Sequence, residues 1–278
     1  MYRFVALGVL LIGSAEARAD WLLIDDFEME ESLPGWQNAD VDNQTDPKVE
    51  NPQVTEIVRG DADNQFLIKK PAAEGIVGNR KALSYLALPA PVPVGETWTF
   101  YTRINVEYFP NNHVFGITNQ GPDGIEKLAY DALEPSLRVT DKWESDGTTN
   151  DGALMVRLGG GYANIRNERE DRSARPMSPG TWYEVWYVVN NDKASAGGQT
   201  YDVYVRGGDE FPEQQKVFSN ADFRMKRELP LTYFMANCNT GPADRPYGNG
   251  GLRYDDLYMA PGLELGTPGN EHGAPDGR

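Results

Sequence analysis

The sequence has few of the residues that cross-link a secreted fold or carry protons near neutral pH. It contains one cysteine, Cys238, in 278 residues, so no disulfide can form within the chain. Cys238 ends the apolar run 233–238, which indicates a buried thiol packed as a small hydrophobe rather than a nucleophile. Only two histidines, His113 and His272, are present, and helical periodicity is almost absent.

Long apolar runs are also missing, except for one at the amino terminus. Residues 4–12 are apolar, follow the basic start Met1-Tyr2-Arg3 and precede Ala17-Arg18-Ala19. This order is typical of a cleavable signal peptide, and the run is too short to span a bilayer. We therefore predict a signal peptide over 1–19, cleaved after Ala19 or alternatively after Ala17. A secreted or periplasmic protein is expected.

Positive charge is scarce, with 26 Lys and Arg against 42 Asp and Glu and a formal net charge of −16. Such a charge repels nucleic acid and anionic membranes, so neither is an expected partner. It also argues against a polyanionic glycan, unless positive charge is concentrated in one cleft. We expect a monomer with no membrane contact.

Turn residues are abundant, with 29 glycines and 19 prolines. Clusters of Gly, Pro, Asn and Asp separate short runs rich in β-branched and aromatic residues, which predicts many strands and no helix. The expected strands are 21–28, 54–58, 65–69, 82–88, 97–108, 113–118, 153–158, 162–166, 181–190, 200–206, 231–238 and 252–259. This pattern favours one all-β, two-sheet sandwich over 20–265. The polar tail 266–278, which contains His272, is expected to be disordered.

Two long insertions interrupt the strand pattern, at 119–152 and 167–179. Loops of this length are often functional. The first carries Tyr130, Arg138 and Trp143 among many acidic residues. A ligand-binding loop and a solvated surface excursion both fit this composition, and the two interpretations stay open.

The strand 97–108 is the first candidate for a ligand-binding face. Its alternation places an apolar row from Trp98 to Val106 on one face and a polar row on the other. The polar row consists of Tyr101, Arg103, Asn105 and Glu107. These side chains supply the donors, acceptors and stacking surface that sugars require, although a solvated strand would carry a similar row.

Other strands add three candidates. Leu154, Val156 and Leu158 indicate a core face, which turns Arg157 outward, and Asn237 shares a face with Tyr233 and Met235. His113 stands at the start of a strand, after a polar turn. A lone histidine is more often structural than catalytic, yet it is our first choice for a proton carrier if the site is catalytic.

Six groups of residues, spread over nearly the whole chain, carry a resemblance to a known superfamily. They are Asp25–Glu28; Gly60–Gln65; Thr97–Arg103 with His113–Gly116; Pro179–Tyr183 with Val185–Trp186; Tyr201–Val205; and Tyr254–Pro261. In this order they resemble the laminin G-like, concanavalin A-like lectin/glucanase superfamily of secreted bacterial jelly-roll domains. The resemblance implies an all-β, antiparallel jelly-roll sandwich and constrains function only loosely.

The resemblance also implies a structural calcium ion shared by the first and last strands. Calcium takes about six to eight oxygen ligands, which carboxylates and backbone carbonyls of these segments can supply. Glu28, Asp63 and Asp256 are the predicted ligands. Edge charges and a turn motif fit the same residues, and no contiguous calcium loop is present.

The first functional hypothesis is a carbohydrate-binding module that recognises a polysaccharide on its concave sheet. Its predicted ligand-binding residues are Tyr101, Arg103, Asn105, Glu107, Arg157 and Asn237. A structural or adhesive surface protein is a further alternative that nothing in the sequence excludes.

The enzymatic alternative is a polysaccharide lyase that acts by β-elimination on a uronate-containing glycan. Lyases of this superfamily use a Tyr/His pair as base and acid, and an Arg with an Asn or Gln to neutralise the uronate carboxylate. Tyr101, His113, Arg103 and Asn237 are the matching residue types. The lyase motifs R-[ST]-E-x-R and Q-[IV]-H are absent, as is the E-x-D-x-x-E motif of retaining glucanases, so hydrolysis is disfavoured.

Overall fold

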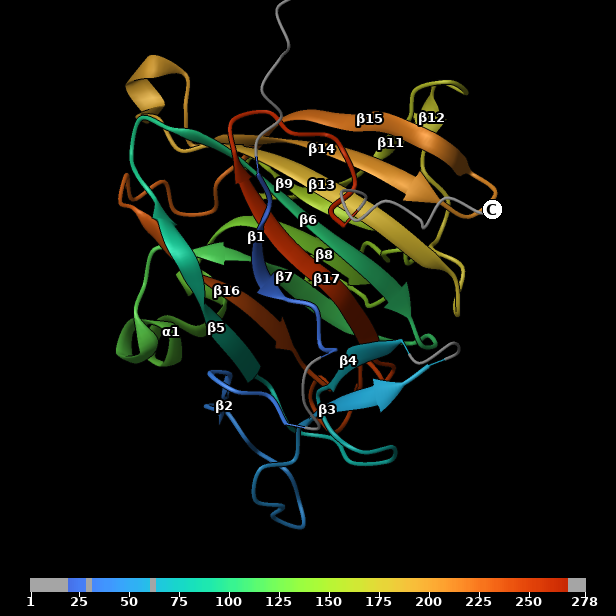
Figure 1. Cartoon of the computed structure of the whole chain (residues 1–278). Coiled ribbons are helices and arrows are strands. Elements are labelled where there is room, and N and C mark those ends of the chain that lie inside the picture. The colour runs from blue at the N-terminus through green and yellow to red at the C-terminus, as the bar shows by residue number, and fades with distance from the viewer. Residues whose placement is uncertain (1–19, 29–31, 61–63, 270–278) are drawn as a thin grey trace, which may run out of the picture.

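The computed structural model describes residues 20–28, 32–60 and 64–269, which form two stacked antiparallel sheets (Figure 1). The first sheet runs β15 (Phe211–Asp222), β14 (Thr200–Gly207), β13 (Trp182–Asn190), β6 (Thr97–Val106), β17 (Leu252–Pro261), β4 (Gln65–Lys70) and β3 (Val54–Arg59), with β1 (Leu22–Asp25) paired to β17. The second runs β10 (Gly161–Asn164), β9 (Leu154–Leu158), β8 (Leu133–Thr140), β7 (Asn112–Thr118), β16 (Leu231–Cys238), β5 (Ala82–Val92) and β2 (Gln37–Asp40). The predicted all-β jelly-roll sandwich is confirmed.

Few other elements occur in the described ranges. β11 (Arg166–Asn167) and β12 (Arg172–Ser173) form a small hairpin, α1 (Pro122–Leu128) is the one α-helix, and 3-10 turns span Ala129–Ala132 and Ala194–Ala196. Neither α1 nor these turns are long and apolar enough to cross a membrane. The predicted signal peptide and residues 270–278 of the predicted tail lie outside the described residues.

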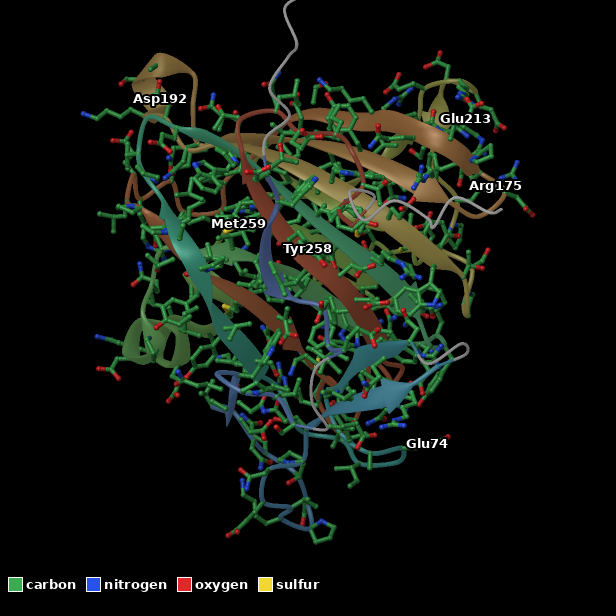
Figure 2. All side chains as sticks on the ribbon, viewed as in Figure 1. Glu74, Arg175, Asp192, Glu213, Tyr258 and Met259 are labelled. Carbon is green, nitrogen blue, oxygen red and sulfur yellow. The ribbon has the colours of Figure 1, made fainter. Side chains whose placement is uncertain are left out.

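The core fills the space between the sheets with side chains that alternate along each strand. On β6, Trp98, Phe100, Ile104 and Val106 are buried in this core, as the alternation predicts. On β17, Met259 is buried in the core while the preceding Tyr258 lies on the outer face (Figure 2). This alternation places every second residue of a strand on an outer face, which is where a ligand can bind.

The predicted loop 119–152 is wrong in two respects, because it contains a helix and a central strand. Pro122 occupies the first turn of α1, where its missing N–H costs nothing, and Asp123 and Lys127 complement the helix dipole. The helix is short and buries only Ile125, so its apolar period is too brief to detect. β8 follows directly and lies between β7 and β9.

The outer face of the eight-stranded sheet is covered by segments near both ends of the described chain. The Trp21 ring packs 6.0 Å from that of Tyr101, centroid to centroid. Near the other end, the Gly262 carbonyl accepts a hydrogen bond from Thr99 (2.7 Å), and the Gly266 carbonyl accepts one from the Trp186 indole (2.9 Å). The polar row of β6 therefore faces protein rather than an open ligand surface.

Replacing Gly116 with alanine is expected to destabilise the seven-stranded sheet. A Cβ atom at Gly116 on β7 would lie 2.0 Å from the Pro135 carbonyl oxygen, so β7 and β8 would have to separate. We expect a loss of about 3 kcal/mol in the free energy of unfolding, measured by denaturant titration. Gly160→Ala is the control, because a Cβ there meets nothing within 4 Å. Equal stability of the two variants would contradict this account of the β7–β8 contact.

Candidate functional site

A cavity of about 600 Å³ lies on the outer face of the seven-stranded sheet. Its floor follows from the strand register, which pairs Asn237 on β16 with Val114 on β7, Val114 with Arg138 on β8, and Arg138 with Met155 on β9. Paired residues of adjacent strands point to the same face, so these four side chains form one row. All four line the cavity.

The walls of the cavity come from segments that are far apart in the sequence. Tyr130 rises from the turn after α1, Tyr162 from the edge strand β10, and Arg224 from the segment after β15. The loop 141–152 and residues 80–81 contribute the remaining sides. The helix α1 with its following turn packs on the same face of the sheet, over Leu83, Val114 and Met235, which confines the open part of this face to the cavity.

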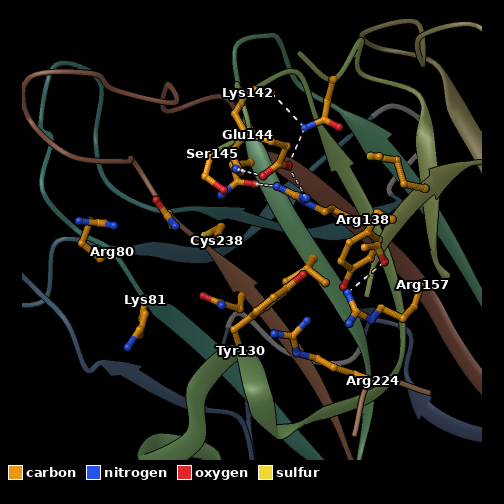
Figure 3. A pocket seen from close by; sticks show the side chains of 18 of the residues that line it. Arg80, Lys81, Tyr130, Arg138, Lys142, Glu144, Ser145, Arg157, Arg224 and Cys238 are labelled. Atoms are coloured by element: carbon orange, nitrogen blue, oxygen red, sulfur yellow. Dashed lines mark hydrogen bonds and ion pairs between the residues drawn. The ribbon is translucent and has the colours of Figure 1, made fainter. Parts of the chain in front are cut away.

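Positive charge gathers in this cavity, although the chain as a whole carries a net charge of −16. Six basic side chains line it, against three acidic ones. The basic residues are Arg80, Lys81, Arg138, Lys142, Arg157 and Arg224, and the acidic residues are Asp42, Glu144 and Asp146. Arg80 and Lys81 approach from one side and Arg157 from the other, with Tyr130 and Arg138 between them (Figure 3). Basic side chains therefore outnumber acidic ones in this cavity, and four of the six (Lys81, Arg138, Lys142 and Arg224) have a carboxylate partner in Asp42, Glu144 or Asp131.

Arg138 is held near the centre of the cavity by three neighbours. Its guanidinium lies 2.7 Å from a Glu144 oxygen and 3.2 Å from the Asn112 side-chain oxygen. It also lies 5.2 Å from the centroid of the Tyr162 ring. These contacts fix the orientation of the guanidinium, so little entropy is lost when it binds an anion.

Glu144 organises the cations rather than acting as an acid or base. Burial opposes its ionisation, but the hydrogen bond from Lys142 (2.6 Å) and the charge of Arg138 outweigh burial and lower the pKa of Glu144 to about 2. Asn150 donates a further hydrogen bond of 2.8 Å to this carboxylate. Glu144 is therefore ionised at any pH near neutrality and stays paired with the cations around it.

Two tyrosines give the cavity aromatic surface and hydroxyl groups. The Arg157 guanidinium lies 5.6 Å from the Tyr162 ring centroid, and the Tyr162 hydroxyl lies 3.0 Å from that of Ser136. The Tyr130 ring is 3.9 Å from the Arg224 guanidinium. Burial, together with the neighbouring Tyr162, raises the pKa of Tyr130 well above its ordinary value, so its phenol stays protonated.

Asn237 adds an acceptor to the floor. Its side chain is 6% exposed, and its Oδ1 atom has no hydrogen-bond partner among the described residues. A buried polar atom without a partner costs free energy, which a ligand hydroxyl or a bound water would recover. Of the six residues predicted to bind a ligand, Asn237 and Arg157 line this cavity, and so do Tyr130 and Arg138 of the predicted insertion 119–152.

The other predicted ligand-binding residues belong to the eight-stranded sheet and have protein partners. Tyr101 is 2% exposed and donates a hydrogen bond of 3.0 Å to Glu184. The Asn105 side chain accepts a hydrogen bond from Arg253 (3.3 Å), and Glu107 forms an ion pair with Lys70 (2.7 Å). The structure does not bring these residues together with Arg157 and Asn237.

Arg103 is also removed from the cavity. Its guanidinium lies 3.1 Å from Asp255 and 3.2 Å from Asp256, and it covers the Trp182 ring at 5.0 Å. Both carboxylates lie on β17 of the eight-stranded sheet. Arg103 therefore has two carboxylate partners within the fold and faces away from the seven-stranded sheet.

His113 does not reach the cavity either. It alternates with Asn112 and Val114, which line the cavity, and is itself 1% exposed. Its Nε2 atom lies 2.8 Å from the Gly250 carbonyl oxygen, and burial lowers the pKa of His113 to about 3, against the effect of that hydrogen bond. The predicted catalytic set His113, Tyr101, Arg103 and Asn237 is therefore divided between the interior, the outer face of the other sheet and the cavity.

The predicted calcium ligands do not form a metal site in the part of the chain that the structure describes. Asp63 lies outside that part. Glu28 accepts a hydrogen bond of 2.8 Å from the Gln65 backbone, and Asp256 is paired with Arg103. No group of three or more His, Cys, Asp or Glu side chains placed to hold a metal was found among the described residues. Asp255 and Asp256 have Arg103 as a partner, and a calcium site that includes Asp63 stays a prediction from the sequence.

The comparisons with known proteins concern the fold. No family model and no curated protein matches the sequence. Among solved structures, the chain is similar to the winged bean acidic lectin complexed with methyl-α-D-galactose, with a TM-score of 0.48, 8% identity and coverage of 89% of this chain and 100% of the lectin chain. It is also similar to the PL-14 alginate lyase from Aplysia kurodai, with a TM-score of 0.46, 12% identity and coverage of 75% and 87%.

A third similar structure is the GH131 β-glucanase catalytic domain from Podospora anserina, with a TM-score of 0.45, 11% identity and coverage of 77% of this chain and 79% of that chain. The resemblance read from the sequence implied a concanavalin A-like sandwich. Two stacked antiparallel sheets in the order described above are the fold observed, so the resemblance is confirmed for the architecture.

Proposed function

We propose that the protein binds an acidic polysaccharide in the cavity on the outer face of its seven-stranded sheet. One observation carries the proposal: six basic side chains converge on one cavity of a chain whose net charge is −16. A cavity with fixed guanidinium groups selects carboxylate or sulfate groups, because Arg pairs with both in a bidentate manner. The net charge of −16 alone argues against a polyanion, and the local excess of basic side chains in this cavity favours one.

The aromatic and amide groups of the cavity support a sugar over other polyanions. Tyr130 and Tyr162 offer ring faces to the C–H side of a pyranose, and Asn237 offers an unpartnered acceptor to a hydroxyl. A polysaccharide presents both features at regular spacing along one chain. The predicted signal peptide supports binding outside the cytoplasm. A mature protein that retains residues 1–19 and stays inside the cell would contradict that location, and an exported protein that does not begin at Asp20 or Arg18 would contradict the predicted cleavage site.

The test is a binding panel with the purified protein lacking residues 1–19. Polygalacturonate, alginate, a sulfated galactan, neutral glucan and single-stranded DNA are compared by calorimetry at fixed salt. We expect binding of at least one acidic polysaccharide, weaker binding at higher salt, and no binding of the neutral glucan. Comparison of the uronates with the sulfated galactan identifies the acidic group. Equal affinity for DNA would reduce the site to a general polyanion surface, and no binding of any acidic glycan would overturn the proposal.

A polysaccharide lyase is the second candidate, favoured by the tyrosine of the cavity whose phenol stays protonated. In β-elimination a base removes the C5 proton of a uronate, the electron pair forms the C4–C5 double bond, and the C4–O bond breaks. Tyr130 is suited to protonate the departing oxygen and Arg138 to neutralise the carboxylate, while the unpartnered Asn237 Oδ1 atom accepts from a sugar hydroxyl. Lys142 can act as the base only after it loses the proton that it donates to Glu144, a loss that burial favours by lowering the pKa of Lys142. New ultraviolet absorbance from unsaturated products in the same panel would distinguish cleavage from binding.

Hydrolysis by two carboxylates is not proposed. Glu144 is paired with Arg138 and Lys142, so it offers neither a protonated acid nor a free nucleophile. Calcium is likewise no part of the proposal, because no group of three or more metal-binding side chains was found among the described residues. A calcium site that uses Asp63 remains a prediction from the sequence.

A further inference from the structure

A second cavity lies beside the first, beyond Lys142. Its volume is about 190 Å³, and its lining includes Lys142, Trp143, Arg245 and Tyr247. Trp143 is 52% exposed, the most exposed aromatic side chain among the large exposed hydrophobics of the described residues. The function proposed for the first cavity does not use Trp143, Arg245 or Tyr247.

The loop that carries the exposed indole is held by backbone pairing, and the indole itself has one cation contact. Trp143 forms a β-bridge with Thr149, and the Asn150 N–H donates to the Lys142 carbonyl at 3.1 Å, so the loop folds back on itself. The Arg245 guanidinium lies 4.8 Å from the Trp143 ring centroid. A large apolar ring that is exposed yet fixed is typical of a binding surface, because ordering it on binding costs little entropy.

Lys142 joins the two cavities. Its ammonium lies 2.6 Å from a Glu144 oxygen on the side of the first cavity and 4.9 Å from the Tyr247 ring centroid on the side of the second. It lines both. A chain bound in the first cavity can therefore continue past Lys142 to Arg245, on a lining that also includes the carboxylate of Asp141.

We propose that the second cavity is an outer subsite for the same acidic polysaccharide, in which one sugar ring stacks on Trp143 and its acidic group pairs with Arg245. This inference rests on the function proposed for the first cavity. Stacking uses the apolar C–H face of a pyranose, and Arg245 supplies the positive charge that a substituent on the ring edge requires. The subsite makes affinity depend on chain length, since only a ligand long enough to pass Lys142 reaches Trp143.

The experiment measures Kd for oligosaccharides of increasing length, from the disaccharide upward, prepared from galacturonate, alginate and sulfated galactan. Trp143→Ala is expected to weaken binding of long oligomers about tenfold and to leave the affinity for the disaccharide within about twofold. Trp143→Phe retains an aromatic ring and is expected to restore most of the loss. Leu263→Ala, at a side chain that is 65% exposed, is the control and should change no affinity.

The outcomes separate the two proposals. Long oligomers that bind both wild type and Trp143→Ala equally would overturn the subsite and leave the first cavity intact. An equal loss for all lengths would also overturn it, because Trp143 would then act on the first cavity. Wild-type protein that binds no acidic oligomer of any length would overturn both. Because Trp143 is exposed, unchanged melting temperatures of the variants are expected and confirm folding.

Discussion

Replacing Arg138 with alanine is expected to weaken binding of the acidic polysaccharide about 100-fold. A loss of this size corresponds to the binding free energy of one or two charge-assisted hydrogen bonds. Arg138 lies in the row of four residues that forms the cavity floor, and Glu144, Asn112 and Tyr162 fix its guanidinium. The variant removes a cation of fixed orientation from the centre of the cavity, between the basic side chains on its two sides. Isothermal titration calorimetry with the polysaccharide selected by the panel measures the loss.

The control for this prediction separates a local charge from the total charge. Lys193→Ala makes the same change in net charge in the loop between β13 and β14, on the other sheet, and its residue does not line the cavity. We expect it to alter affinity less than twofold. If both variants lose affinity equally, binding follows the overall field of the protein and the cavity assignment is wrong. Arg138→Ala leaves Glu144 with Lys142 and Asn150, so a modest change in melting temperature is expected.

Part of this site follows from strand alternation alone. The faces assigned to Arg157 and Asn237 are those observed, because the inward residues beside them, Leu154 and Val156 on β9 and Phe234 and Ala236 on β16, are apolar. Leu158, which the same alternation assigns to the core, is 47% exposed at the end of β9. The same rule, applied to β7, would have turned His113 inward with Phe115 and Ile117, both of which are buried in the core. The alternation of apolar residues along β7 therefore predicts the position of His113 better than the ability of histidine to carry a proton.

The rest of the site depends on contacts that no single segment reveals. The polar row of β6 looks like a ligand face until Trp21 and residues 262–266 are placed over it. β8 was hidden because Glu134 and Pro135 interrupt its pattern, although Leu137 and Val139 alternate with Ser136 and Arg138. The missed strand β15 is an edge strand, where polar residues and proline are tolerated. The basic side chains of the cavity come from five segments of the chain. The composition gives only the total number of basic residues, so it does not show that six of them lie together.

Replacing Glu134 with alanine is expected to lower the free energy of unfolding by about 4 kcal/mol. Glu134 on β8 is fully buried, and its carboxylate accepts hydrogen bonds of 2.9 Å from the backbone N–H groups of Met225 and Lys226. It also pairs with Arg227 at 2.9 Å. The variant leaves two N–H donors and a largely buried guanidinium without this partner, and each loss adds to the cost.

Glu134 also connects stability to the cavity, because the segment it holds carries Arg224. The backbone N–H of Arg224 donates to the backbone carbonyl of Glu134 at 3.0 Å. The guanidinium of Arg224 covers the Tyr130 ring in the cavity wall. Thermal melting is expected to fall by roughly 10 °C for Glu134→Ala. Glu213→Ala is the matched control: Glu213 pairs with Arg169, but its side chain is 75% exposed, so the melting temperature should shift by about 1 °C or less. Similar shifts in melting temperature for both variants would mean that the buried Glu134 carboxylate does not anchor the segment 224–227. The position of Arg224 in the cavity wall would then have to depend on other contacts.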